Sequence, residues 1–191
     1  MKRIATALPD VVLLEPAVYS DARGCFLEAY NARDFRKLAI DRQFVQDNQS
    51  HSVHGVLRGL HYQLQHPQAK LVRVVFGAVF DVAVDVRWGS PTFGHWVGTV
   101  LSGDNHRLLF IPEGFAHGFY VLSDTAEFVY KCSEFYCPAD DRGLLWSDPA
   151  LGIDWPLPPG TKPLLSDKDA RHPGLDDIRR GELPRYREAA A

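Results

Sequence analysis

The sequence has few cysteines, no long hydrophobic run and no surplus of one charge. Its three cysteines, Cys25, Cys132 and Cys137, are an odd number without a CxxC pair, so neither a disulfide framework nor a zinc site of that kind is expected. No run of 18 apolar residues is present, and the N-terminal segment lacks the apolar stretch of a secretory signal. We therefore expect a cytoplasmic protein without a membrane partner.

Charge is nearly balanced, with 21 Lys and Arg against 24 Asp and Glu. This balance argues against non-specific binding of nucleic acid, although a local basic pocket for a phosphate remains possible. Hydrophobic residues make up 46% of the 191 residues, which is typical of a packed globule. We expect one domain over residues 1–191, with an irregular, Pro-rich C-terminal segment from about residue 148.

Short runs rich in Val, Phe, Tyr and Leu alternate with turn residues, a pattern that predicts a β-sandwich or barrel. In the clearest strand, 79–86, the even positions are apolar and should face a core. The odd positions include Asp81 and Asp85 and should face water, a partner or a polar cavity. Asn31 could cap a short helix over 32–39, and a second could start near Asp176. Other expected strands are 25–30, 44–50, 56–62, 71–76, 94–101, 108–111, 118–122 and 127–132.

The densest group of candidate functional residues lies in 55–63 and includes Arg58 and His61. On a regular strand these two side chains would point to opposite faces. They could line one pocket only if Gly59 marks a bulge or bend. The other interpretation, a core histidine and a solvent-exposed arginine, stays open from the pattern alone.

Two further candidates are His117 and Tyr130. His117 lies between Ala116 and Gly118, so a ligand could approach it closely, although the backbone could equally satisfy its ring. The local pattern around Tyr130 is that of a core tyrosine. The spacings of His51 with His54 and of His61 with His66 are weak metal signals.

Nine stretches, taken in order along the chain, resemble the dTDP-4-dehydrorhamnose 3,5-epimerase family. The resemblance implies a mainly β, cupin-type jelly-roll barrel with a few short helices, a homodimer, and catalysis without metal or other cofactor. It implies epimerisation of dTDP-4-dehydro-6-deoxy-D-glucose at C3 and C5, in the dTDP-rhamnose pathway to cell-surface polysaccharide. The stretches are 23–28, 46–50, 55–63, 68–74, 81–87, 90–94, 111–119, 146–149 and 165–169.

The same resemblance implies catalytic roles for four residues. His61 matches the base, and Tyr130 matches the proton donor on the opposite face of the sugar. Asp169 matches the carboxylate that partners the histidine, although local spacing does not separate it from Asp167. Lys70 matches a lysine that stabilises the enolate oxygen.

Substrate contacts also follow from the resemblance. Arg23 and Arg58 match ligands of the diphosphate, and Tyr136 matches an aromatic that stacks on the thymine. Asp141 stands where the family more usually has glutamate. The N-terminal segment that bears Arg23 and Glu28 is commonly donated by the partner subunit. The full expected set is Arg23, Phe26, Glu28, Gln46, Asp47, Asn48, Arg58, Lys70, His117, Tyr136, Asp141 and Lys168.

Three alternatives differ in chemistry. A relative could invert only C3 or only C5 with the same base and acid. A metal-dependent cupin could use His61, His66 or His117 with Glu113. A non-catalytic module would bind the sugar nucleotide without exchanging its protons.

Overall fold

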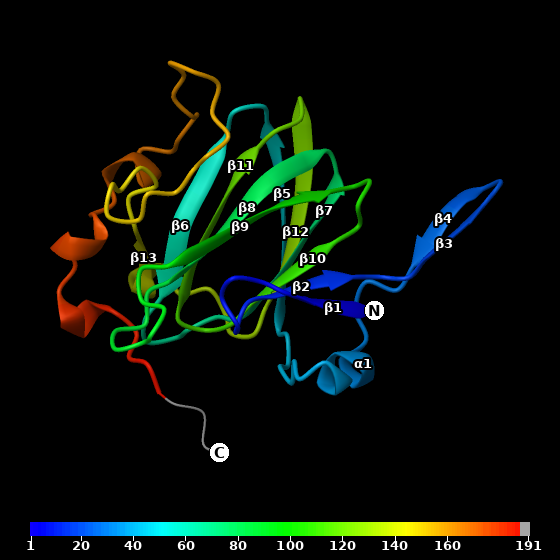
Figure 1. Ribbon diagram of the computed structural model, residues 1–191, viewed down its shortest axis with the longest axis horizontal. Coiled ribbons are helices and arrows are strands. Elements are labelled where there is room, and N and C mark those ends of the chain that lie inside the picture. Colours follow the sequence, from blue (N-terminus) through cyan, green and yellow to red (C-terminus); the bar gives the residue numbers. More distant parts are fainter. Residues whose placement is uncertain (188–191) are drawn as a thin grey trace.

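The computed structural model describes residues 1–187 of the chain, and Figure 1 shows them as two facing β-sheets with a hairpin that projects to one side. The strands are β1 (Lys2–Ala5), β2 (Val12–Glu15), β3 (Val18–Asp21), β4 (Gly24–Leu27), β5 (Gln46–Val53), β6 (Leu57–Gln63), β7 (Lys70–Phe76), β8 (Ala78–Asp85), β9 (Trp96–Ser102), β10 (Leu108–Ile111), β11 (Phe115–Val121), β12 (Thr125–Cys132) and β13 (Asp141–Gly143). The helix is α1 (Ala32–Lys37), and four 3₁₀ turns are η1 (Pro138–Asp140), η2 (Asp169–Arg171), η3 (Leu175–Asp177) and η4 (Arg180–Glu182).

The two sheets have the non-sequential strand order of a jelly roll. One sheet runs β1-β2-β10-β7-β12-β5 and the other β13-β6-β11-β8-β9, and the strands within both pair antiparallel. Neighbours in space are therefore often distant in sequence. The predicted mainly β jelly roll is confirmed, although the two sheets stay separate in their hydrogen bonding and do not close into one barrel.

The main core fills the space between the sheets. Buried residues of the six-stranded sheet, such as Val72 and Leu109, pack there against Val79, Ala83 and Phe119 of the other sheet. This inner core supports the cavity described below.

A second core covers the outer face of the five-stranded sheet. Val82 and Val84 point away from the inner core and pack against Trp155, Leu175 and Leu183 of the C-terminal segment. In that segment the structure has short 3₁₀ turns and irregular chain, and in Figure 1 its orange and red chain lies beside β6 and β13.

Strand β8 is therefore buried on both faces, which corrects part of the expectation for its odd positions. The predicted apolar face does pack into a core. Asp81 and Asp85 have no exposed surface, and Asp81 contacts the His117 side chain. Asp85 instead accepts hydrogen bonds from Arg87, Ser90 and Thr92, so a closed polar cluster takes the place of solvent.

The helix agrees with its sequence signals. The Asn31 side chain accepts a hydrogen bond from the Arg33 amide, and α1 begins at the next residue after this cap. It ends at Lys37, two residues short of the prediction, and Ala39 has a left-handed φ of 61°. Near Asp176 there is a single 3₁₀ turn, η3, in place of a helix.

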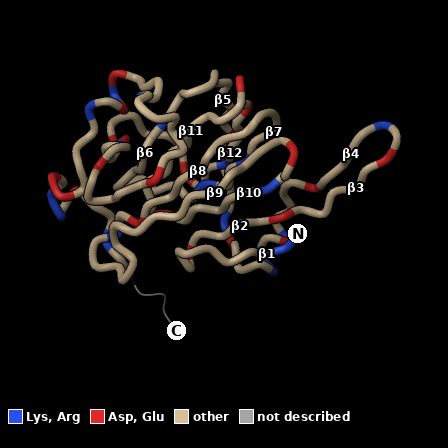
Figure 2. Tube along the Cα trace, turned by 45° about the horizontal axis from the view of Figure 1, so that its top comes forward, with Lys and Arg blue, Asp and Glu red and all other residues tan. Residues whose placement is uncertain are grey.

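Charges of both signs are spread over loops and strand ends, and no segment is dominated by one sign (Figure 2). Among the described residues, no helix is both long enough and apolar enough to cross a bilayer.

Candidate active site

A cavity of about 290 Å³ gathers seven of the fifteen site residues expected from the sequence. Its walls come from both sheets, with β6 and β11 on one side and β5, β7 and β12 on the other, and from the C-terminal residues 166–169. Stacked Phe119 and Phe128 rings, with centroids 4.2 Å apart, link it to the inner core. The predicted residues that line it are Arg58, His61, Lys70, His117, Tyr130, Lys168 and Asp169.

A bulge in β6 explains how Arg58 and His61 share this cavity. Opposite β11, His61 pairs with His117 and Arg58 pairs with Phe119, so two β6 residues face Gly118 alone. Gly59 has φ +125°, and a Cβ there would lie 2.5 Å from the Gly118 Cα. Only glycine fits this close approach, and the bend at Gly59 that a shared pocket requires is present.

His61 is paired with a carboxylate from a distant part of the chain. Its Nε2 lies 2.6 Å from Asp169 Oδ1, and the two side chains are 31% and 6% exposed. Asp169 begins η2, where its amide donates to Ser166 Oγ at 3.1 Å. Asp167 is exposed, so the structure brings Asp169 and not Asp167 to His61.

Asp169 is held in its ionised form. Burial by itself raises the pKa of this carboxyl, but the neighbouring imidazoles of His172 and His61 outweigh burial and bring the pKa well below its ordinary value. Because a carboxylate at this position favours a positive charge on the ring beside it, His61 is equipped to accept a proton.

His117 forms a second histidine–carboxylate pair in the next strand. Its Nε2 lies 2.9 Å from Asp81 Oδ2, and the two side chains are only 7% and 0% exposed. The His117 ring also stacks on Phe128, with centroids 6.0 Å apart. This pair lies deeper than the His61 pair and is fixed on several sides.

Tyr130 enters the cavity from the six-stranded sheet, across from His61. Burial, with smaller effects from Cys132 and other neighbours, raises the pKa of its phenol to about 12. The hydroxyl therefore keeps its proton throughout the neutral range, as a proton donor requires. The local sequence pattern favours a core position for Tyr130, but in the structure its side chain lines the cavity.

Lys70, the first residue of β7, supplies a half-buried cation to the same cavity. Burial lowers the pKa of its ammonium, partly offset by the thiol of Cys132 and the carboxylates of Asp141 and Asp81. A desolvated cation interacts strongly with a negative charge that develops nearby.

Five predicted contacts form a hydrogen-bonded group at the rim. Asp141 Oδ2 accepts from the Tyr136 hydroxyl at 2.8 Å and from the Lys168 ammonium. Gln46 accepts from the Tyr136 amide at 2.9 Å and donates to Asn48 Oδ1 at 3.0 Å. Asp141 thus links the aromatic Tyr136 to Lys168.

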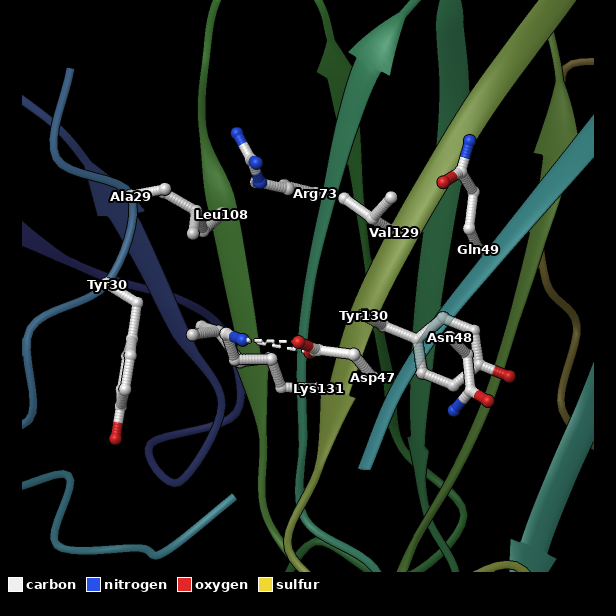
Figure 3. A pocket seen from close by; sticks show the side chains of 11 residues that line it. Ala29, Tyr30, Asp47, Asn48, Gln49, Arg73, Leu108, Val129, Tyr130 and Lys131 are labelled. Atoms are coloured by element: carbon white, nitrogen blue, oxygen red, sulfur yellow. Dashed lines mark hydrogen bonds and ion pairs between the residues drawn. The ribbon is translucent and has the colours of Figure 1, made fainter. Parts of the chain in front are cut away.

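Asp47 lies apart from this cavity. Its carboxylate pairs with Lys131 at 2.9 Å, in a second cavity of about 390 Å³ lined also by Tyr30, Arg73 and Leu108. Figure 3 shows the Asp47–Lys131 ion pair near Tyr30, while the Tyr130 ring and the Asn48 amide lie together on the other side of the view. Within one chain, Asp47 is not a wall of the His61 cavity.

Three predicted contacts lie on the projecting hairpin or just after it. Arg23 is 90% exposed on its side chain and bonds only to Asp21, and Phe26 is 70% exposed. Glu28 accepts from Asn31. The chain itself therefore does not bring Arg23, Phe26 or Glu28 to the cavity.

Sequence reasoning missed several residues around the site. Gln49, Ser50, Phe119, Phe128 and Ser166 also line the cavity. The sequence signal for this group is indirect: Gln49 and Ser50 lie in the matched stretch 46–50, Phe119 ends the stretch 111–119, and Ser166 lies in 165–169. Nothing local indicates that Phe119 and Phe128 stack across two sheets.

The residues named for a metal-dependent cupin are mostly engaged elsewhere. Glu113 accepts from Arg42 at 2.9 Å and from Ser133 at 3.3 Å. His117 contacts Asp81, and His66 is exposed. His61 contacts Asp169, so this set does not converge on one point.

Comparison with known proteins gives consistent matches over nearly the whole chain. Residues 5–177 match the family model described as dTDP-4-dehydrorhamnose 3,5-epimerase. A protein of that description from Shigella flexneri is 58% identical over 172 residues, covering 88% of this chain and 93% of its own length. Another, from Neisseria gonorrhoeae, is 59% identical over 169 residues, and the chain spans about half of its length, 51%.

A solved structure is similar in fold as well as in sequence. The dTDP-6-deoxy-D-glucose-3,5-epimerase of Legionella pneumophila, in complex with dTDP-4-keto-L-rhamnose, is 52% identical with a TM-score of 0.94. The match covers 97% of this chain and 98% of that one. At this identity, the likeness extends to the family as well as to the fold.

Proposed function

The chain belongs to the dTDP-4-dehydrorhamnose 3,5-epimerase family, and from that premise we propose that it converts dTDP-4-dehydro-6-deoxy-D-glucose into dTDP-4-dehydro-L-rhamnose. It is an isomerase that inverts C3 and C5 of the sugar. One observation carries the proposal: a carboxylate-paired histidine and a half-buried tyrosine, supplied by different sheets, line the same cavity.

The substrate's own ketone makes the chemistry accessible to ordinary side chains. C3 and C5 are both adjacent to the C4 carbonyl, so loss of either proton gives an enolate. His61 takes that proton, and Asp169 stabilises the imidazolium that forms. Since Nε2 faces Asp169, Nδ1 is the ring atom that accepts the proton from carbon.

Inversion requires a proton from the other face of the sugar. Tyr130 is suited to give it, because it comes from the facing sheet and its raised pKa keeps the hydroxyl protonated. Lys70 lies in the wall that also carries Tyr130, where its cation stabilises the enolate oxygen between the two proton transfers.

The remaining contacts suit a nucleoside diphosphate. Arg58 is exposed, and its Nε donates to Ser52, which leaves the ends of its guanidinium for phosphate oxygens. His117 and Lys168 add donors in the same cavity. Tyr136 is 52% exposed and offers a face for the thymine, while hydrogen bonds to Gln46 and Asp141 hold it in place. Gln46 is in turn held by a hydrogen bond to Asn48.

The proposal includes a homodimer in which the β3–β4 hairpin of one subunit reaches the other's cavity. The hairpin exposes Tyr19 and Phe26, at 68% and 70%, and a free-standing two-stranded hairpin is marginally stable in water. Packing against a partner would bury these rings and bring Arg23, Phe26 and Glu28 to the substrate. Asp47, outside the cavity in one chain, would then lie on the side of the sheet available to the partner.

We also place the protein in the cytoplasm. All three cysteines are unpaired, which agrees with a reducing compartment.

Incubation with dTDP-4-dehydro-6-deoxyglucose in deuterated water tests the reaction. Proton NMR should show deuterium at both C3 and C5 and the appearance of the L-rhamno product. Deuterium at one carbon alone would identify a single-site epimerase instead. Tight dTDP binding with no uptake at either carbon would leave a binding module and refute the proposal.

A further inference from the structure

A second imidazole contacts the carboxylate that partners His61. His172 Nε2 lies 3.6 Å from Asp169 Oδ1, the same oxygen that His61 Nε2 approaches to 2.6 Å. The two histidine rings meet edge to face with centroids 5.6 Å apart. One carboxylate oxygen is thus shared by two imidazoles.

The surroundings fix His172 in this place. Its side chain is only 9% exposed. Gly143, in the strand beside His61, makes room for it, because a Cβ at Gly143 would come within 2.4 Å of the His172 ring. Within residues 1–187, Nε2 of His172 is one of four buried side-chain polar atoms without a hydrogen bond, so a small inward shift toward Asp169 would satisfy it.

Few other charges act on this ring. Within the described part of the chain, Asp169 is the one carboxylate at ion-pair distance from His172. From β6 and the later elements, the further ionisable groups that line the shallow cavity on its other side are Tyr62, Asp141, Arg142 and Glu182. None of these forms a hydrogen bond with the His172 ring among the residues that the structure describes.

We propose that His172 is a positioning residue for the reaction, which shares Asp169 with His61 and thereby limits the proton affinity of His61. This rests on the proposed function, in which His61 is the base. When His172 donates to Asp169, the carboxylate has less negative charge to offer the His61 imidazolium. The base is therefore more often free of a proton near neutral pH, while Asp169 stays aligned with it.

Two substitutions separate the role of His172 from simple packing. His172→Phe keeps a ring of similar size but has no donor. His172→Gln keeps an amide N–H near the place of Nε2 and carries no charge. Both are compared with wild type by following kcat and KM from the acid to the alkaline side of neutrality, after circular dichroism has established that they are folded.

The acid limb of kcat/KM should move upward by about one pH unit in His172→Phe, because Asp169 then supports the His61 imidazolium alone. A several-fold fall in kcat with nearly constant KM should accompany it, since Asp169 loses one of its two supports. His172→Gln should return the limb close to that of wild type. An unchanged acid limb in both variants would overturn the proposal.

Two controls keep the outcome interpretable. If His172→Phe does not fold, His172→Asn, which is too short to reach Asp169, replaces it with the same expected shift. Deuterium uptake by wild type is measured first: no uptake refutes the proposed function itself, whereas uptake with an unmoved acid limb in the variants refutes only the role of His172.

Discussion

Two histidine–carboxylate pairs lie on neighbouring strands of this protein. They differ in exposure and in where the carboxylate comes from, and these differences suit one pair to proton transfer and the other to a structural or binding role. His61 and His117 are direct partners across β6 and β11. His61 is 31% exposed and its carboxylate comes from a turn 108 residues later. His117 is 7% exposed and its carboxylate, Asp81, comes from β8, the adjacent strand.

The two imidazole rings differ in how much of each is accessible from the cavity. His117 is enclosed by Asp81 and a stacked Phe128, so it is suited to hold one geometry and donate to a ligand. His61 contacts Asp169 and the His172 ring, but its side chain is 31% exposed, so part of its ring is open to the cavity. A general base needs that combination of a fixed partner and free access.

Breaking the open pair should have the largest effect. We expect His61→Asn to lower kcat/KM by a factor of about 10²–10⁴, because the group that removes the carbon-bound proton is gone. Steady-state kinetics coupled to a dehydrogenase that consumes the product would measure this. A loss of less than tenfold would contradict the assignment of the base.

Tyr130→Phe should have the next largest effect. It should lower the rate of net inversion much more than the rate of proton loss to solvent, whereas both rates fall together in His61→Asn. The donor hydroxyl is removed, while the base and its carboxylate remain. Net inversion should therefore fall by about 10²-fold, with proton loss to solvent reduced much less. NMR in deuterated water separates the two, since exchange with retention gives labelled substrate. An equal fall in both would count against Tyr130 as the opposite-face acid.

The effects on stability should rank the other way: breaking the His117 pair should cost more free energy of unfolding than breaking the His61 pair. His117→Asn leaves the Asp81 carboxylate buried and without its partner, so the free energy of unfolding should fall by about 3 kcal/mol. His61→Asn affects a half-open position, and its cost should stay below about 1 kcal/mol. Urea denaturation followed by circular dichroism compares them. A larger loss for His61→Asn would show that the two pairs have been assigned the wrong way round.

The pH profile sharpens the same contrast with a smaller effect. A raised pKa means that the Tyr130 phenol ionises later than usual, at about pH 12, so the alkaline limb of kcat/KM should not begin near the ordinary tyrosine value. The lowered pKa of Asp169 means that it stays charged at neutral and mildly acid pH, so the acid limb reports an imidazole. Any fall in activity near pH 10 should therefore come from another group and should persist in Tyr130→Phe. A fall near pH 10 that is seen in wild type and disappears in Tyr130→Phe would contradict the raised pKa of Tyr130.

The smallest expected effect is that of chelation. If His61 acts as a base with Asp169, prolonged dialysis against EDTA should leave kcat and KM unchanged. Metal content by mass spectrometry before and after dialysis provides the control. Activity that falls on chelation and returns with one added metal would favour the metal-dependent cupin.

Much of the fold could be predicted from local pattern, because strands such as β8 and β12 carry alternating or continuous apolar residues between clear turns. Strand β13 could not: its three residues are polar or glycine, and they form a strand only because β6 offers a free edge. Strands β1, β2 and β3, each of four residues, were not predicted either.

In the site, too, features within one short segment could be predicted, and features that join distant segments could not. Arg58 and His61 stand in one short segment, so the need for a bulge at Gly59 was visible in the sequence. The pairing of His61 with Asp169 depends on how a tail more than a hundred residues later packs on β6, and local spacing favours Asp167 equally. Only the family resemblance anticipated it. His172 had no signal at all, because its relation to Asp169 exists only after the η2 turn has formed.

The most direct test is to compare proton washout from the substrate in deuterated water by His61→Asn and His117→Asn, at saturating substrate and at a temperature where both variants are folded. The account predicts that His117→Asn still exchanges the C3 and C5 protons, whereas His61→Asn exchanges neither. Exchange that survives in His61→Asn and disappears in His117→Asn would place the base on the wrong strand.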